Sequence, residues 1–205
     1  MFGLFKTKGK SPELEYHVYK SQIALYRQLI NELIKGSNSK GKILLIYHFD
    51  ATGDALEKLL NSAQISFTKL RSLGSTDSKI TLASAKEFKK YSVLKNYSSI
   101  LFSEIHPMAG VDVDYYQSIE SQNNLAEVVF YASMDNLILA QFGAERIIGL
   151  MDKMGMEENE KIEHKMITKS IFKAQEKIKK SIVHEKEAES VLEWMELNIH
   201  GMRSN

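Results

Sequence analysis

Two residues able to exchange a proton stand close together near the middle of the chain. Glu104 and His106 lie at the end of a predicted strand, Ser98–Ile105. Residues two apart in a strand point to the same side, and α/β sheets bind ligands at the carboxyl ends of their strands. The pair could therefore hold a polar ligand or act as an acid and a base. It could equally be a hydrogen-bonded strand end with a structural role.

Other catalytic and metal-binding patterns are missing from the sequence. The chain has no cysteine, which excludes disulfides, thiolate nucleophiles and cysteine metal sites. His48, His106 and His164 are far apart along the chain, and neither H-x-x-x-H nor H-E-x-x-H occurs. Neither a Gly-x-Ser-x-Gly elbow nor the phosphate-binding Gly-x-x-x-x-Gly-Lys-Ser/Thr loop is present. We therefore expect no metal, no cofactor and no enzymatic activity.

The composition is that of an ordinary globular protein. Of the 205 residues, 43% are hydrophobic and 26% are charged, and the net charge is +1. This balance gives no reason to expect nucleic acid as a partner. No apolar run has the length of a membrane span. Residues 1–12 have the composition of a disordered basic tail rather than a signal peptide, so a cytoplasmic location is expected.

Apolar runs separated by polar turns predict an α/β domain. We expect strands at Lys42–Phe49, Ile65–Leu70, Lys79–Ala83, Ser98–Ile105 and Ala126–Ala132. Helical spacing is found at Glu13–Lys35, around Ala55–Leu60, and at Ala85–Leu94, Val111–Gln122, Met134–Gln141 and Ala144–Met154. This strand–helix alternation indicates a mostly parallel sheet with helices on both faces.

The last part of the chain predicts one long helix. From Ile162 to Asn198 apolar residues recur at helical spacing, without proline or glycine. A helix of roughly 35 residues is about 50 Å long, so its far end would extend beyond a compact domain. Apolar residues there would need a partner, with Trp194 as the anchor. The candidate interaction surface consists of Ile182, Val191, Leu192, Trp194 and Met195. The alternative is a helix that breaks and folds back on its own domain.

Several unusual motifs follow the last predicted strand. Phe130 to Ile147 reads FYASMDNLILAQFGAERI. Further motifs are Met151–Met156 (MDKMGM), Ile162–Met166 (IEHKM) and Ala174–Lys177 (AQEK). Together they resemble the part of SecA, the bacterial preprotein-translocation ATPase, that leaves the second RecA-like motor domain and enters the helical scaffold. Weaker collinear similarity at Tyr16–Ile34, Lys42–Leu60 and Phe102–His106 extends the resemblance over Glu13–Lys180.

The resemblance implies a fold and a division of the chain. The fold would be a RecA-like, helicase C-terminal-type sheet, mostly parallel, followed by a long C-terminal helix. After the tail, residues 13–156 would form a degenerate second motor domain and residues 157–205 a scaffold-type helix. The chain would then be a truncated, degenerate SecA-like protein.

One departure from the family bears on activity. The second motor domain of SecA supplies an arginine-rich Gly-Arg-x-Gly-Arg-x-Gly-Asp segment. The corresponding residues here, Tyr116–Asn124 (YQSIESQNN), contain no arginine. Loss of an arginine that stabilises the transferred phosphoryl group typically lowers the rate by about 10³–10⁵.

These observations lead to a hypothesis of a non-catalytic accessory or adaptor protein that acts by protein–protein interaction. Its partner would be the translocation machinery, a full-length SecA or a second copy of itself in a homodimer. A second hypothesis, from a different class of function, is that the chain forms half of a split ATPase. Another chain would complete it by supplying the phosphate loop. A third is an independent enzyme that uses Glu104 and His106, for which no complete catalytic set is visible.

Overall fold

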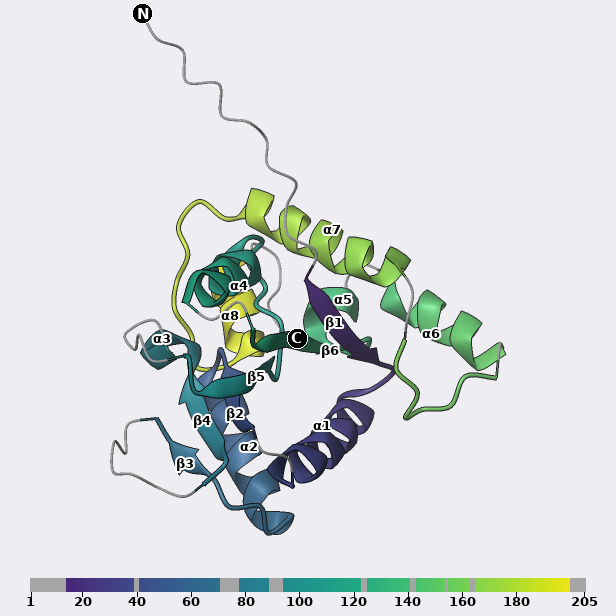
Figure 1. The fold of residues 1–205 in the computed structure, drawn as a ribbon. Coiled ribbons are helices and arrows are strands. Elements are labelled where there is room, and N and C mark those ends of the chain that lie inside the picture. The colour runs from purple at the N-terminus through teal and green to yellow at the C-terminus, as the bar shows by residue number, and fades with distance from the viewer. Residues whose placement is uncertain are drawn as a thin grey trace, which may run out of the picture.

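The computed structural model describes most of the chain (Figure 1). The described residues are 14–38, 41–70, 78–88, 94–122, 125–140, 143–153, 155–162 and 165–199. The predicted basic tail and His164 lie outside them.

One parallel sheet forms the centre of the molecule. Within the described residues its six strands are β1 (Glu15–Tyr19), β2 (Lys42–Tyr47), β3 (Thr68–Lys69), β4 (Ile80–Ser84), β5 (Tyr97–Phe102) and β6 (Glu127–Ser133). They run in the order β1-β6-β5-β2-β4-β3, and every pairing is parallel. The predicted parallel α/β fold is therefore confirmed, with all five predicted strands present, although β3 is only two residues long.

Strand β1 differs from the sequence-based expectation. Its residues were predicted to begin a helix at Glu13, but they pair with β6 instead. The run Tyr16–Tyr19 contains aromatic and β-branched residues, which favour strands. The helix begins only after Ser21, whose hydroxyl accepts a hydrogen bond from the Ala24 amide at 3.1 Å.

Helices cover both faces of the sheet (Figure 1). They are α1 (Gln22–Ser37), α2 (Asp50–Ser62), α3 (Ala85–Phe88), α4 (Val111–Gln122), α5 (Leu137–Ala140), α6 (Ala144–Lys153), α7 (Lys165–Ser181) and α8 (Val191–Asn198). Alternate residues of the central strand point to opposite cores. Leu44 and Ile46 pack with α4, α7 and α8, whereas Ile43 and Leu45 pack with α1 and α2.

The C-terminal region is helical, as predicted, but it is not one long helix. Helix α7 ends at Ser181, residues 182–190 are not helical, and α8 begins at Val191. Trp194 and Met195 are only 1% and 0% exposed and belong to the same core cluster as α4 and α7. The fold-back alternative therefore describes the structure. None of the helices in the described part of the chain is long and apolar enough to cross a membrane.

Candidate functional site

A cluster of buried polar residues, including His48, Asp112 and Gln175, lies near the boundary between β2 and β5 in the sheet. From β2 the sheet extends through β4 to β3 on one side, and from β5 it extends through β6 to β1 on the other. Since all strands are parallel, their carboxyl ends lie at one edge of the sheet. His48 directly follows β2, and Glu104 and His106 follow β5. Open α/β sheets bind ligands at the carboxyl ends of their strands.

Asp112 on α4 is the centre of this region. Its carboxylate is buried and accepts hydrogen bonds from the backbone N–H of His106 at 3.2 Å and from the Gln175 side-chain amide at 2.9 Å. The Nε2 atom of His48 lies 3.2 Å from Asp112 Oδ1, at an angle outside that of a hydrogen bond. Gln175 also donates to the His106 carbonyl at 2.7 Å. Asp112 thus connects β2, the loop after β5, and α7.

His106 lies among three aromatic rings from two segments, the connection between β2 and α2 and helix α8. Its ring centroid is 5.1 Å from that of His48, 5.8 Å from that of Phe49 and 5.7 Å from that of Trp194. Its Nδ1 atom accepts a hydrogen bond from the Met108 amide at 3.0 Å. In the neutral ring the proton is therefore on Nε2, which lies 3.7 Å from Glu185 Oε1.

Glu104 has a different environment from His106. Its carboxylate accepts hydrogen bonds from the amides of His48 at 2.9 Å and Phe49 at 3.0 Å, and from the Thr52 hydroxyl at 2.8 Å. These donors are at the beginning of α2, where the backbone N–H groups lack helical partners. Burial raises the pKa of Glu104, against the opposing effects of His48 and these hydrogen bonds. This carboxylate therefore caps the beginning of α2. For Glu104, this arrangement matches the alternative of a hydrogen-bonded strand end with a structural role.

A cavity opens beside His106 at the same edge. Its volume is about 290 Å³, and its walls include Phe49, Tyr115 and Trp194. The segment between α7 and α8 contributes Glu185 and Glu187 to the lining. The lysine that lines it, Lys86, has its ammonium 2.5 Å from the Glu187 carboxylate.

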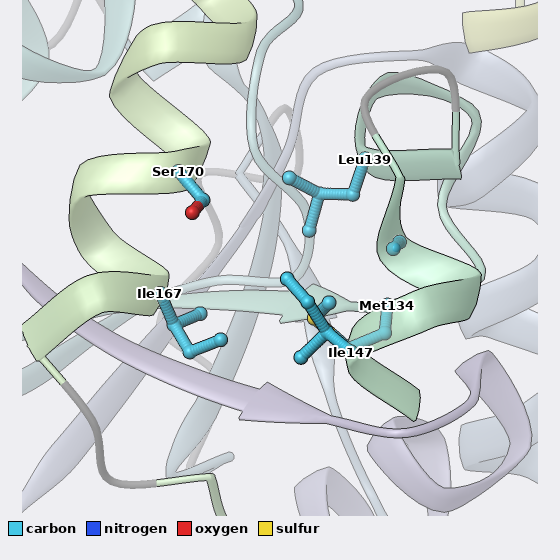
Figure 2. Close-up of a pocket in the computed structure, with 6 residues that line it drawn as sticks. Met134, Leu139, Ile147, Ile167 and Ser170 are labelled. Carbon is cyan, nitrogen blue, oxygen red and sulfur yellow. The ribbon is translucent and has the colours of Figure 1, made fainter. Parts of the chain in front are cut away.

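A second cavity is too small and too apolar for a polar ligand (Figure 2). Its volume is about 20 Å³, and it lies between α7 and the region of α5 and α6. Its labelled lining residues are Met134, Leu139, Ile147, Ile167 and Ser170. With a lining this apolar, the cavity is expected to stay dry.

The predicted interaction residues do not form one exposed surface. Trp194 and Met195 are buried, and Ile182 and Val191 are half-buried. Leu192 is 49% exposed. The expectation that Trp194 lies beyond the reach of the sheet is wrong, because the chain turns back after α7 and brings α8 to the edge of the sheet.

A glycine-lysine sequence near β2 does not have the context of a phosphate loop. Gly36, Gly41 and Lys42 have the Gly-x-x-x-x-Gly-Lys spacing, but Ile43 replaces the Ser or Thr. A phosphate loop follows a strand and opens a helix. Here α1 ends at Ser37 and Lys42 begins β2, so the order of elements is reversed.

The grouping of His48 with His106 and Asp112 was not foreseen. The two histidines are 58 positions apart in the sequence, yet they follow neighbouring parallel strands. Only a prediction that β2 and β5 are neighbours in the sheet could have placed His48 close to His106. Within the described ranges, no three His, Asp or Glu side chains are arranged to hold a metal ion.

Comparison with known proteins gives one consistent relationship. The chain is 27% identical over 180 residues to the protein translocase subunit SecA of Chlorobaculum tepidum, covering 78% of this chain and 17% of that protein. It is 30% identical over 154 residues to SecA of Christiangramia forsetii, covering 75% and 13%. Identity reaches 43% over 79 residues with SecA of Chlorobium phaeobacteroides, covering 38% and 8%. The predicted SecA resemblance is confirmed.

The chain spans less than a fifth of the length of these relatives. No family model matches it. Among solved structures, the C-terminal part of the Fun30 ATPase domain has a TM-score of 0.46 and 14% identity, covering 76% of this chain and 54% of that one. This structural likeness is too low to support an argument.

Proposed function

We propose that this chain, which is SecA-like in sequence over about three quarters of its length, is a non-catalytic accessory protein of protein translocation. It would act by contact with another protein, either the translocation machinery or a full-length SecA. Its relatives are named as translocase subunits, which supports the link to translocation.

The charge around the cavity is the observation that carries the proposal. The arginine-rich segment of the family is expected on α4, but the residues of α4, VDVDYYQSIESQ, include no cationic side chain. Among the corresponding residues on α4, Glu120 is the charged one, and Asp112 and Asp114 precede them on the same helix. At the cavity itself, Glu185 and Glu187 supply two carboxylates. Carboxylates around a site repel the phosphates of a nucleotide, and the repulsion grows where water is excluded.

The position of the C-terminal segment supports the same conclusion. The Ala51 amide donates a hydrogen bond to the Glu189 carbonyl at 2.9 Å, so the segment before α8 lies against the beginning of α2. Trp194 then covers one side of His106. A nucleotide approaching the carboxyl edge of β2 and β5 would meet this segment of the chain first.

A direct binding assay tests the proposed contact. The immobilised chain is exposed to purified SecA from the same cell, and to the purified translocation machinery, with the heat-denatured chain as control. We expect saturable binding to one of them that persists at about 0.15 M salt, where surface charge effects are screened beyond roughly 8 Å. Binding no stronger than that of the denatured chain to either partner would contradict the proposal.

A further inference from the structure

The C-terminal segment is held together by its own contacts. We define the C-terminal unit as residues 185–198, which contain α8. The Trp194 indole donates to Glu185 at 3.0 Å, and the Asn198 side chain exchanges hydrogen bonds with the backbone N–H and carbonyl of Lys186 at 2.6 and 2.9 Å. Ser190 accepts from the Glu193 amide at 3.1 Å. The unit can therefore move without losing these contacts.

A short hinge, two of whose three residues are exposed, joins this unit to α7. The hinge consists of residues 182–184; Val183 is 88% exposed, and His184 is exposed as well. No glycine or proline occurs between Lys165 and Asn198, so no residue in the hinge prevents α7 from continuing. The hinge sequence therefore allows α7 to continue, and the docked position of the unit goes with the turn seen at the hinge.

The docking surface for the unit is made of other parts of the same chain. Glu189 accepts from the Ala51 amide, Glu187 pairs with Lys86, and Trp194 packs against His106. A second copy of the chain presents the identical surface. If α7 continues through the hinge, the unit moves away from its own sheet and can dock on that of the other copy with the same contacts.

We propose that two copies of the chain exchange their C-terminal units and form a domain-swapped dimer. Exchange restores every contact between the unit and the sheet while only the hinge changes conformation, which makes swapping a low-cost route to a dimer. The helical spacing that continues from α7 into the hinge favours the open form. This inference rests on the proposed protein-contact function and names a second copy as one partner. The two proposals can fail separately. The chain could stay monomeric and still bind SecA, or it could form the exchanged dimer without binding SecA.

Mixed cysteine variants distinguish the exchanged dimer from the monomer. The chain has no cysteine of its own, so one variant carries Ala51→Cys and a second, differently tagged, carries Glu189→Cys. A disulfide requires Cα atoms within about 7 Å, so a bond between the two variants forms only if the unit of one copy docks on the sheet of the other. We expect the mixed product to exceed either homodimeric product at least tenfold after the variants are unfolded and refolded together.

Two further measurements complete the test. Light scattering of the wild type should show a concentration-dependent rise from 23.4 kDa toward twice that mass. Insertion of a Gly-Ser linker between Val183 and His184 should abolish the rise, because a longer flexible hinge lets each unit return to its own sheet. Mixed disulfides no more abundant than the homodimeric ones, with a wild type that remains at 23.4 kDa at all concentrations, would overturn the proposal.

Discussion

Asp112 is the single side chain on which the candidate site depends most. It is buried, and it accepts hydrogen bonds from the loop after β5 and from α7 while lying beside His48. Replacing it by alanine removes the carboxylate that the His106 amide donates to and one of the two acceptors of the Gln175 side chain, and loss of buried hydrogen-bond partners is costly.

We expect Asp112→Ala to lower the free energy of unfolding by about 3 kcal/mol or more. Urea denaturation followed by circular dichroism measures this change. Asp114→Ala is the matched control, since Asp114 lies on the same helix but is exposed, and its effect should stay below about 1 kcal/mol. Equal losses for the two variants would show that Asp112 does not organise the site.

His17 gives the molecule a pH dependence far from the cavity. Its ring is buried, with Nδ1 3.4 Å from Glu32, Nε2 3.2 Å from Glu15 and the Lys161 ammonium 3.4 Å from Nε2. Burial lowers the pKa of His17, but Glu32 outweighs it and the pKa lies above its ordinary 6.5. Burial raises the pKa of Glu32, but the hydrogen bonds from His17 and Tyr131 outweigh it and the pKa lies below its ordinary 4.5.

The raised pKa of His17 and the lowered pKa of Glu32 affect stability in separate pH ranges. The contribution of protonated His17 to stability is complete below pH 6.5 and is lost as pH rises through its folded pKa. The contribution of Glu32 is complete above pH 4.5 and is lost as pH falls through its own folded pKa. We expect His17→Gln to reduce the loss of stability above pH 6.5, as measured by urea midpoints across pH. His184→Gln, at an exposed histidine, should leave the profile unchanged; an equal effect of both variants would refute this assignment.

At the scale of elements, a local sequence motif marks the start of α8 as a separate helix. The helical spacing of apolar residues, considered alone, does not reveal this break between α7 and α8. Ser190 and Glu193 have the Ser-x-x-Glu spacing of a capping box. The Glu193 amide donates to Ser190 at 3.1 Å, and the Glu193 carboxylate accepts from the Glu189 amide at 2.7 Å. A helix start at this position competes with continuation of α7, and burial of Trp194 favours the start.

Trp194 should therefore behave as a core residue of its own chain. We expect Trp194→Ala to lower the free energy of unfolding by about 3–5 kcal/mol, because it opens a cavity in the core that α8 shares with α4 and α7. Leu192→Ala, on the exposed side of the same helix, should cost less than about 1 kcal/mol. Thermal or urea unfolding of both variants makes the comparison. A Trp194 variant as stable as the Leu192 variant would mean that α8 does not dock as the structure shows.

At the scale of the whole molecule, patterns confined to one segment were predictable and contacts between segments were not. The runs Ile43–Tyr47 and Val128–Ala132 are continuously apolar, so they were predicted to lie in buried strands. Strand β1 was missed because its five residues adjoin a strong helical pattern. The contact of Asp112 with Gln175 joins positions 63 apart, and no local pattern reports such a contact.

Calorimetric titration of the isolated chain with ATP and Mg²⁺, together with an assay of phosphate release, tests the central claim most directly. The residues of α4 that correspond to the arginine-rich segment include no arginine. The cavity is lined by Glu185 and Glu187, and its Lys86 is paired with Glu187. We predict no binding tighter than about 1 mM, which corresponds to about −4 kcal/mol, and no phosphate release above background. Micromolar binding of ATP, or phosphate release that His106→Ala abolishes, would contradict the proposal that the protein is non-catalytic.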